Sequence, residues 1–243
     1  MTAVQGFDPA DLLRRIAAAS DDLLATAAGF SDPDVRAPSL LPDWSRGHVL
    51  THLARNADGG RHLLVWARTG VPTPEYPSME ARAEQIEAGA GRSAATLLAD
   101  VRDSADRFAE EYARMPAEAW QHVVRWTGGQ EHPAARAADS RLGEVLVHHV
   151  DLDAGYTPAH WPTAFTTEML PMVVAAFNAR SDAPAMSLHA TDSGDRYEVG
   201  RVDGAPAVHG SQSSLLAWLM GRGPGADLTV PGGAALPRPP FLY

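Results

Sequence analysis

Apolar residues recur at helical spacing through roughly the first 155 residues of the chain. Asp8 is a suitable N-cap for a first helix that begins with Pro9 and ends at Gly29, because proline fits the first helical position and glycine favours a helix end. Ser45 is a suitable cap for a second helix, which continues to about Thr69. The pattern therefore predicts two helices in this part of the chain.

Two further helices are predicted before the pattern changes. From Ser78 to Met115, helix-forming residues predominate and an intermittent apolar stripe continues until Pro116, which predicts the longest helix of the chain. After an irregular aromatic stretch, the segment from Pro133 to Gly155 predicts a fourth helix. Four helices with one long connection between the third and the fourth predict a four-helix bundle.

The character of the chain changes after the loop at residues 156–162. One more helix, from Thr163 to Arg180, is followed by short segments in which apolar and polar residues alternate, as they do in strands. These predicted strands are AMSLHAT, RYEVGRV and PAVHG, and they are followed by a helix QSSLLAWLMG, a last strand ADLTV and an extended tail LPRPPFLY. We therefore expect an α+β protein, with the bundle in residues 1–157 and a smaller α+β domain in residues 158–243.

Composition and charge narrow the classes of function. A chain of 243 residues that is 45% hydrophobic can form a compact core. Its 20 Lys and Arg residues against 30 Asp and Glu residues give a formal net charge of -10, which opposes binding to nucleic acid and to anionic membranes. The first residues lack the pattern of a signal peptide, and no apolar run is long enough to span a membrane. We expect a soluble, cytoplasmic protein that is a monomer. Because the net charge also repels anionic metabolites, a substrate with carboxylates would need a cation in the binding site.

The absence of cysteine restricts the chemistry of the protein itself. With no Cys residue, the chain has no disulfide, no thiolate ligand for zinc and no sulfur nucleophile of its own. Any thiol chemistry must therefore use a thiol from outside the protein.

Histidine and glutamate spacing indicates a candidate metal site. Glu144 and His148 are four residues apart on the fourth predicted helix, so their side chains share one face. His48 and His52 have the same spacing on the second helix, and either of them would complete a set of two histidines and one carboxylate. Such a set suits zinc, and also iron, nickel or manganese. The alternative is a chance spacing, in which Glu144 only forms a surface ion pair with Arg141.

Two segments resemble a known family. The pieces LPDWSRGHVLTHLARNADG and RLGEVLVHHVDLDAGY resemble the metal-binding signatures of the DinB/YfiT-like bundle superfamily, and more narrowly those of its mycothiol-dependent maleylpyruvate isomerase branch. That branch joins the bundle to a smaller α+β domain resembling sterol carrier proteins. With the piece LLAWLMGRG near the end of the chain, the resemblance covers nearly the whole sequence.

The resemblance also implies roles for individual residues. It implies that His52, Glu144 and His148 are the metal ligands, and that His52 and Arg222 are catalytic. Arg222 would reach the active-site cleft and bind the cofactor there; the alternative is a cation favoured by the C-terminus of a helix. From spacing alone, Asp151 either accepts a hydrogen bond from a ligand imidazole or is a solvated residue near a helix end.

The function implied by the resemblance is an isomerisation. With Zn2+ and mycothiol as cofactors, the enzyme would convert maleylpyruvate to fumarylpyruvate in the gentisate pathway of aromatic compound degradation, by thiolate addition, bond rotation and elimination. Its partners would be a small dicarboxylate substrate and a low-molecular-weight thiol. The alternatives are a mycothiol S-transferase, a metal-dependent hydrolase of the same superfamily, and a non-catalytic module that binds a thiol or a metal.

Overall fold

The computed structural model describes residues 7–200 and 204–240. The chain divides into two compact units, Met1–Ala154 and Gly155–Tyr243. Each unit has its own regular elements and is described by itself.

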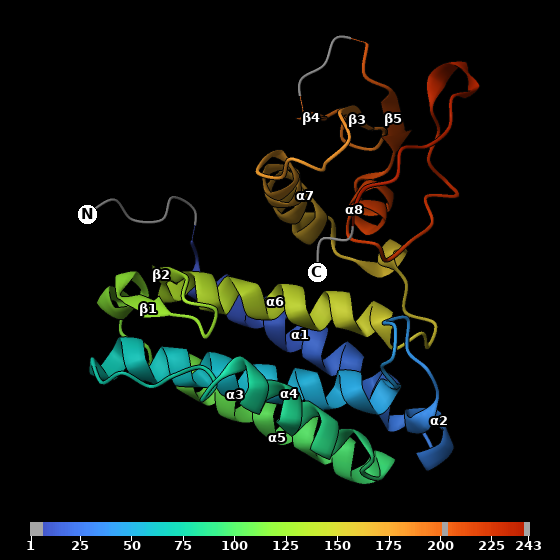
Figure 1. Ribbon diagram of the computed structural model, residues 1–243. Coiled ribbons are helices and arrows are strands. Elements are labelled where there is room, and N and C mark those ends of the chain that lie inside the picture. Colours follow the sequence, from blue (N-terminus) through green and yellow to red (C-terminus); the bar gives the residue numbers. More distant parts are fainter. Residues whose placement is uncertain (1–6, 201–203, 241–243) are drawn as a thin grey trace. The chain divides into compact units, whose positions relative to one another are not determined.

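The first unit is a bundle of helices. Figure 1 shows α1, α3, α5 and α6 lying along one another, and α3 packs against α4, α5 and α6. The two predicted caps are confirmed, because the side chain of Asp8 accepts hydrogen bonds at the start of α1 and that of Ser45 does so at the start of α3. The helices are α1 (Pro9–Ala28), α2 (Asp32–Arg36), α3 (Arg46–Thr69), α4 (Met79–Ala90), α5 (Ala94–Ala113) and α6 (Ala134–Asp151), with a 3-10 turn η1 (Ala117–Gln121) after α5.

The predicted single helix from Ser78 to Met115 is wrong. The chain forms α4 and α5 instead, with Gly91 at the end of α4 and Ser93 as the N-cap of α5. The break lets the end of α4 approach α3 closely. A Cβ atom on Gly47 of α3 would lie 2.2 Å from the carbonyl oxygen of Ala90, so only glycine fits there.

A short hairpin that the sequence pattern did not predict connects α5 to α6. Strands β1 (Val123–Arg125) and β2 (Glu131–Pro133) pair antiparallel. Its turn is closed by a hydrogen bond from the Trp126 amide to the Gln130 carbonyl, at 2.9 Å. Val124 packs against Leu63 and neighbouring alanines of the bundle, and this contact fixes the hairpin beside α3 and α6.

The bundle core lies around α3. Leu50, Leu53, Leu63 and Leu64 of this helix are all buried, and each such side chain contributes about 1.5–3 kcal/mol through its removal from water. The polar side chain of His52 is also buried on this helix. A helix that is buried on several sides can therefore hold a polar group inside the bundle.

The second unit combines helices with a small sheet. Its three strands have the order β4-β3-β5, with β3 antiparallel to β4 and parallel to β5. Helix α7 packs against α8 and β4. The elements are η2 (Pro158–His160), α7 (Thr163–Asn178), β3 (Met186–Ala190), β4 (Arg196–Val199), β5 (Ala207–Gly210), α8 (Gln212–Leu219) and η3 (Pro231–Gly233).

The α+β class is confirmed, with one difference near the end of the chain. The predicted strand ADLTV forms only one isolated bridge, between His209 and Thr229. The last residues of the predicted strand RYEVGRV and of the tail LPRPPFLY lie outside the described residues.

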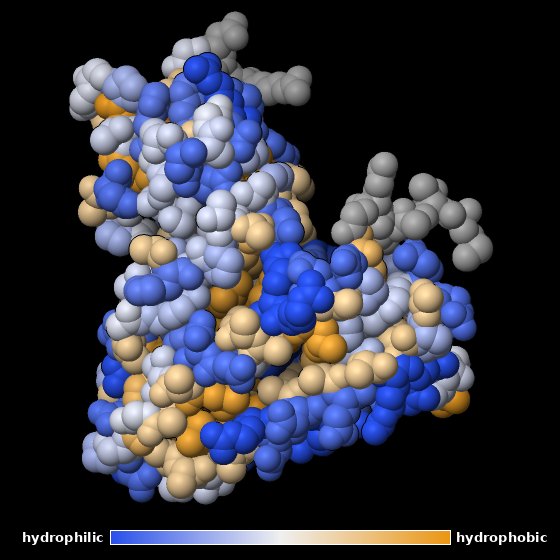
Figure 2. Space-filling view, turned by 180° about the vertical axis from the view of Figure 1, so that it is seen from behind, coloured by the Kyte–Doolittle hydropathy of each residue, from blue (hydrophilic) through white to orange (hydrophobic). Residues whose placement is uncertain are grey.

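The surface is mixed in character. Figure 2 shows hydrophilic and hydrophobic residues interspersed over the visible face. Among the described residues, the large hydrophobic side chains that stay exposed are Leu40, Val71, Met79 and Val123. None of the helices in the described part of the chain has the length and apolar character needed to cross a membrane.

Candidate metal centre

The start of α3 fixes the position of the two histidines on that helix. Ser45 and His48 form a capping box, in which the His48 Nδ1 atom accepts a hydrogen bond from the Ser45 amide at 3.1 Å. The ring of His48 also stacks on Trp44. His48 is thus used at the helix end, whereas His52 lies one turn later and points into the bundle.

Three side chains from two helices converge on one point. The Nε2 atom of His52 lies 2.9 Å from Oε2 of Glu144 and 3.0 Å from Nε2 of His148, and the last two atoms are 3.5 Å apart. Donors about 2.0–2.1 Å from a tetrahedral zinc ion are separated by about 3.3–3.4 Å. The three donors lie within about 0.5 Å of this spacing, so small movements of their side chains would let them hold one such ion. An ion with three protein ligands retains a coordination position for a reactant.

The protonation of the three groups is set by burial and by their mutual contacts. Burial and the nearby His148 lower the pKa of His52 to about 4, so its imidazole is neutral at pH 7. Burial opposes the charge of Glu144, but hydrogen bonds from both histidines hold its pKa well below the usual value. Burial also opposes the charge of His148, yet hydrogen bonds to Asp151 and Glu144 raise its pKa to about 8. An incoming metal ion must therefore displace a proton from His148.

Asp151 orients one of the two imidazoles. Its Oδ2 atom lies 2.8 Å from Nδ1 of His148, and the residue is fully buried. A carboxylate in this position keeps the hydrogen on Nδ1 and leaves the Nε2 lone pair directed at Glu144 and His52. The alternative of a solvated aspartate is wrong.

Arg82 makes a contact that competes with metal binding. Its Nη2 group donates to Nδ1 of His52 at 3.0 Å. A neutral imidazole that ligates a metal through Nε2 carries its hydrogen on Nδ1, which would then face the hydrogens of the guanidinium. The two arrangements exclude each other, so binding of a metal at Nε2 requires Arg82 to release His52.

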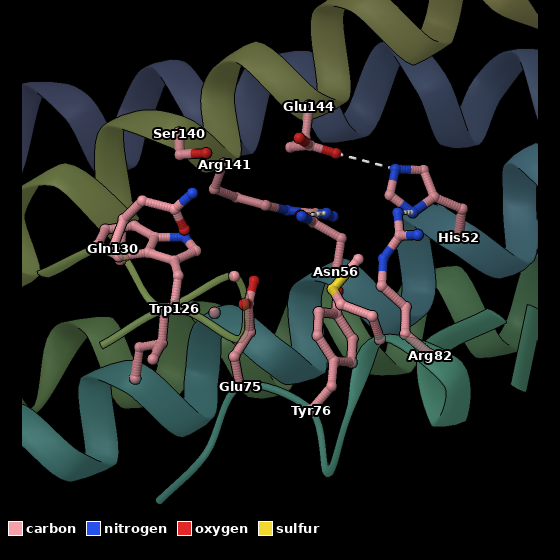
Figure 3. Close-up of a pocket in the computed structure, with 15 residues that line it drawn as sticks. His52, Asn56, Glu75, Tyr76, Arg82, Trp126, Gln130, Ser140, Arg141 and Glu144 are labelled. Atoms are coloured by element: carbon pink, nitrogen blue, oxygen red, sulfur yellow. Dashed lines mark hydrogen bonds and ion pairs between the residues drawn. The ribbon is translucent and has the colours of Figure 1, made fainter. Parts of the chain in front are cut away.

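A pocket of about 350 Å³ lies beside the three donors. Figure 3 shows its walls: His52 and Asn56 come from α3, Glu144 and Arg141 from α6, and further side chains from the connecting segments. These connecting segments contribute Glu75, Tyr76, Trp126 and Gln130. The donors thus border a space large enough for small organic molecules.

Arg141 is buried in the wall of this pocket. It is only 3% exposed, and its Nη1 group donates to the Leu53 carbonyl at 2.9 Å and to Oδ1 of Asn56 at 2.8 Å. Burial lowers its pKa to about 10, so the guanidinium stays charged at pH 7. Within the described part of the chain it forms no ion pair with Glu144, and the alternative of a surface pair between these residues is wrong.

Comparison with known proteins places the chain in a family. The sequence model of the mycothiol maleylpyruvate isomerase N-terminal domain matches residues 16–153, and that of the MDMPI C-terminal domain matches residues 160–239. The chain belongs to the mycothiol maleylpyruvate isomerase family. Two solved structures are similar to it, one of the mycothiol-dependent maleylpyruvate isomerase and one of its H52A mutant. Each is 26% identical in sequence to this chain and has a TM-score of 0.91, and the match covers 99% of this chain and 100% of the solved one. A comparison with curated proteins found no match.

The site residues predicted for this member of the mycothiol maleylpyruvate isomerase family are divided between the two units. His52, Glu144 and His148 are brought together in the first unit. Arg222 follows α8 in the second unit, where its amide donates to the Ala217 carbonyl and its Nη1 group to the Met220 carbonyl, at 2.7 and 2.8 Å. These bonds hold Arg222 at the end of α8, and its catalytic and cofactor-binding roles stay predictions.

Several pocket residues of this mycothiol maleylpyruvate isomerase family member were not among the predicted site residues. Glu75 and Trp126 lie in connecting segments, where no periodic pattern marks them, and Arg82 lies on α4 with no spacing that sets it apart from other helix residues. Burial raises the pKa of Glu75, while the Thr127 amide donates to its Oε2 atom at 3.1 Å and limits the rise. The one sequence signal was the need for a cation beside an anionic substrate, which pointed to Arg222 and not to these residues.

Proposed function

We propose that this chain is a zinc- and mycothiol-dependent isomerase that converts maleylpyruvate to fumarylpyruvate. The observation that carries the proposal is the convergence of His52, Glu144 and His148 at a pocket, in a chain whose family members include a mycothiol-dependent maleylpyruvate isomerase. We further propose that it acts as a monomer in the cytoplasm, where small thiols are kept reduced, in the degradation of aromatic compounds.

Zinc and an external thiol suit the donor set of this chain. When bound, they would supply a thiolate near neutral pH. Its reversible addition to the cis double bond would allow rotation and elimination to the trans isomer. The chain has no cysteine and cannot supply this nucleophile. Two imidazoles and one carboxylate also place less negative charge on the metal than thiolate ligands do, which preserves its ability to acidify a thiol.

The residues of the chain have three tasks in this reaction. His52, Glu144 and His148 hold the metal, and the buried Asp151 keeps His148 in the tautomer that ligation needs. The pocket beside the three donors has room for the reactants, including the ketone oxygen of the substrate that would gain enolate character. Arg222 is proposed to stabilise that oxygen or to bind a carboxylate, which its planar guanidinium suits.

The experiment that tests the proposal is an assay of the purified protein with defined cofactors. Metal content is measured first, and maleylpyruvate is then supplied to the zinc-loaded and the metal-stripped protein, each with and without mycothiol. We expect fumarylpyruvate only when zinc and mycothiol are both present. A stable mycothiol conjugate would identify an S-transferase, cleavage of the substrate would identify a hydrolase, and binding without chemical change would identify a non-catalytic module; each of these results contradicts the proposal.

The role of Arg222 is tested separately. Arg222→Lys keeps the positive charge but removes the two parallel donors of the guanidinium, so we expect turnover to fall about tenfold or more while zinc affinity stays the same. Unchanged turnover would remove Arg222 from the active site.

A further inference from the structure

The two arginines of the pocket lack the direct carboxylate partner that many arginines of the bundle have. Such partners lie within 4.0 Å in the pairs of Arg55 and Arg92 with Asp100, of Arg68 with Glu111 and of Arg107 with Asp58. Arg82 and Arg141 both line the pocket, and among the described residues neither has a carboxylate at that distance. The pocket therefore contains positive charge that the protein does not neutralise by direct pairing.

The hydrogen bonds of Arg141 leave part of its guanidinium available. Both of its bonds within the described part of the chain come from Nη1, and both acceptors are uncharged oxygens, of Leu53 and Asn56. A guanidinium carries five N–H groups, so the donors on Nε and Nη2 have no protein partner there. Figure 3 shows the side chain extending from α6 across the pocket toward Asn56. The edge formed by Nε and Nη2 is the one that binds a carboxylate with two parallel hydrogen bonds.

Burying a cation that has no directly paired anion is costly, because the charge loses its contacts with water. An opposite charge or several hydrogen bonds must replace the solvent, and an anion in contact with Arg141 would do so. The two acids of the pocket lining do not fill this role, because Glu144 faces the two histidines and Glu75 accepts a bond from the Thr127 amide. An anionic ligand that enters the pocket would supply the missing charge.

We propose that Arg141 binds a carboxylate group of the substrate, with Nε and Nη2 of its guanidinium as the donors. The inference rests on the proposed function for the identity of the substrate, which is a dicarboxylate. Mycothiol has no carboxylate, so the anion belongs to the substrate and not to the thiol. Arg141 and Glu144 are three residues apart on α6, one turn of the same helix, so a substrate held by Arg141 lies next to the metal donors.

Arg82 contributes a second positive charge to the pocket that contains Arg141. Its Nη2 group contacts His52, and metal ligation through His52 Nε2 requires this contact to break. Arg82 itself lines the pocket, so its guanidinium is a second positive charge there. Two arginines in one cavity offset part of the repulsion that a net charge of -10 exerts on a dianion.

The test measures binding without turnover. Maleate, a cis dicarboxylate, and maleamide, its uncharged diamide, are titrated calorimetrically into zinc-loaded protein in the absence of mycothiol. For Arg141→Gln we expect the Kd of maleate to rise about 10- to 100-fold and the preference for maleate over maleamide to fall by a similar factor. Arg107→Gln is the matched control, because it removes the same charge from a partly exposed position on α5 that does not line the pocket. Its affinities should equal those of the wild type.

The outcomes separate this inference from its alternatives. If Arg141→Gln keeps the wild-type affinity and preference, or if the wild type does not prefer maleate, the inference is wrong. If the preference is lost in His52→Ala, which lacks the metal ligand, but kept in Arg141→Gln, the carboxylate binds the metal and the inference is again wrong. Should Arg141→Gln fail to fold, as judged by thermal unfolding, Arg141→Lys takes its place. We expect this variant to bind maleate about tenfold more weakly, and an unchanged affinity would overturn the inference.

Failure of the proposed function gives a different result. Maleate binding that depends on Arg141, together with no isomerisation of maleylpyruvate, contradicts the isomerase and supports the carboxylate site. Isomerisation together with maleate binding that ignores Arg141 supports the isomerase and contradicts the carboxylate site.

Discussion

Replacing Asp151 with asparagine should weaken zinc binding although Asp151 does not touch the metal. The carboxylate lies 2.8 Å from His148 Nδ1 and is fully buried, so its charge strengthens the hydrogen bond that orients the imidazole. Asparagine keeps the shape and one acceptor oxygen but loses the charge, and a charged hydrogen bond is about twice as strong as a neutral one. The loss of such a partner typically lowers metal affinity about 10- to 100-fold, which corresponds to about 1.4–2.7 kcal/mol.

Proton competition makes this loss depend on pH. The pKa of about 8 for His148 means that at pH 7 zinc competes with a proton, at a cost of about tenfold in affinity. Asp151→Asn lowers this pKa because the hydrogen bond to the carboxylate is among its causes. At pH 7 the variant therefore loses less zinc affinity, because its His148 competes less with a proton than the wild-type residue does. At pH 9 the wild-type His148 is already neutral, so the variant shows the full loss of affinity. We expect the ratio of the two Kd values to be larger at pH 9 than at pH 7.

The assay is competition for zinc against a chromophoric chelator, at pH 7 and at pH 9. Asp139→Asn is the matched control, because Asp139 lies on the same helix, is partly exposed and pairs with Arg136. It should leave zinc affinity unchanged at both pH values. An Asp151→Asn protein that binds zinc as tightly as the wild type at pH 9 would show that Asp151 does not orient His148.

Three further predictions concern the ligands and the bundle. His52→Ala should bind zinc at least 100-fold more weakly with nearly the same helical circular dichroism, and stoichiometric zinc after dialysis against a chelator would exclude His52 as a ligand. Zinc binding to the wild type should release about one proton from His148 at pH 7 and fewer above pH 8. Calorimetry in buffers of different ionisation enthalpy measures the number of protons released, and a number independent of pH contradicts the assignment. Gly47→Ala should lower the free energy of unfolding by about 1–3 kcal/mol, because its Cβ would collide with Ala90, whereas Gly91→Ala meets no atom within 4 Å and should have little effect in the same denaturant titration.

Helix starts were predictable from the sequence, but the break between α4 and α5 was not recognised. Asp8 and Ser45 cap their helices through bonds to amides two or three residues away, so the signal is entirely local. The signals at the break, Gly91 and Ser93, are equally local but stand in a long run of helix-forming residues. The end of α4 also packs closely on Gly47, and the local pattern does not show this contact because the two residues are far apart in the sequence.

The candidate site was predictable only in part, for a similar reason. The four-residue spacing of Glu144 and His148 places them on one face of a helix, but spacing does not say which histidine of α3 they meet. The resemblance to the family indicated His52, and the structure shows that His48 is used in the helix cap. The burial of Arg141 was not predicted from the sequence, because an arginine on a helix usually faces solvent.

The pocket is built from two kinds of structure, and this has a consequence for how the family can diversify. The metal donors stand on α3 and α6, which pack against each other in the core. Glu75, Tyr76, Trp126 and Gln130 come from short connections, where substitutions and insertions disturb packing least. Substitutions in these connections can therefore alter which molecules the pocket accepts and leave His52, Glu144 and His148 in place on their helices.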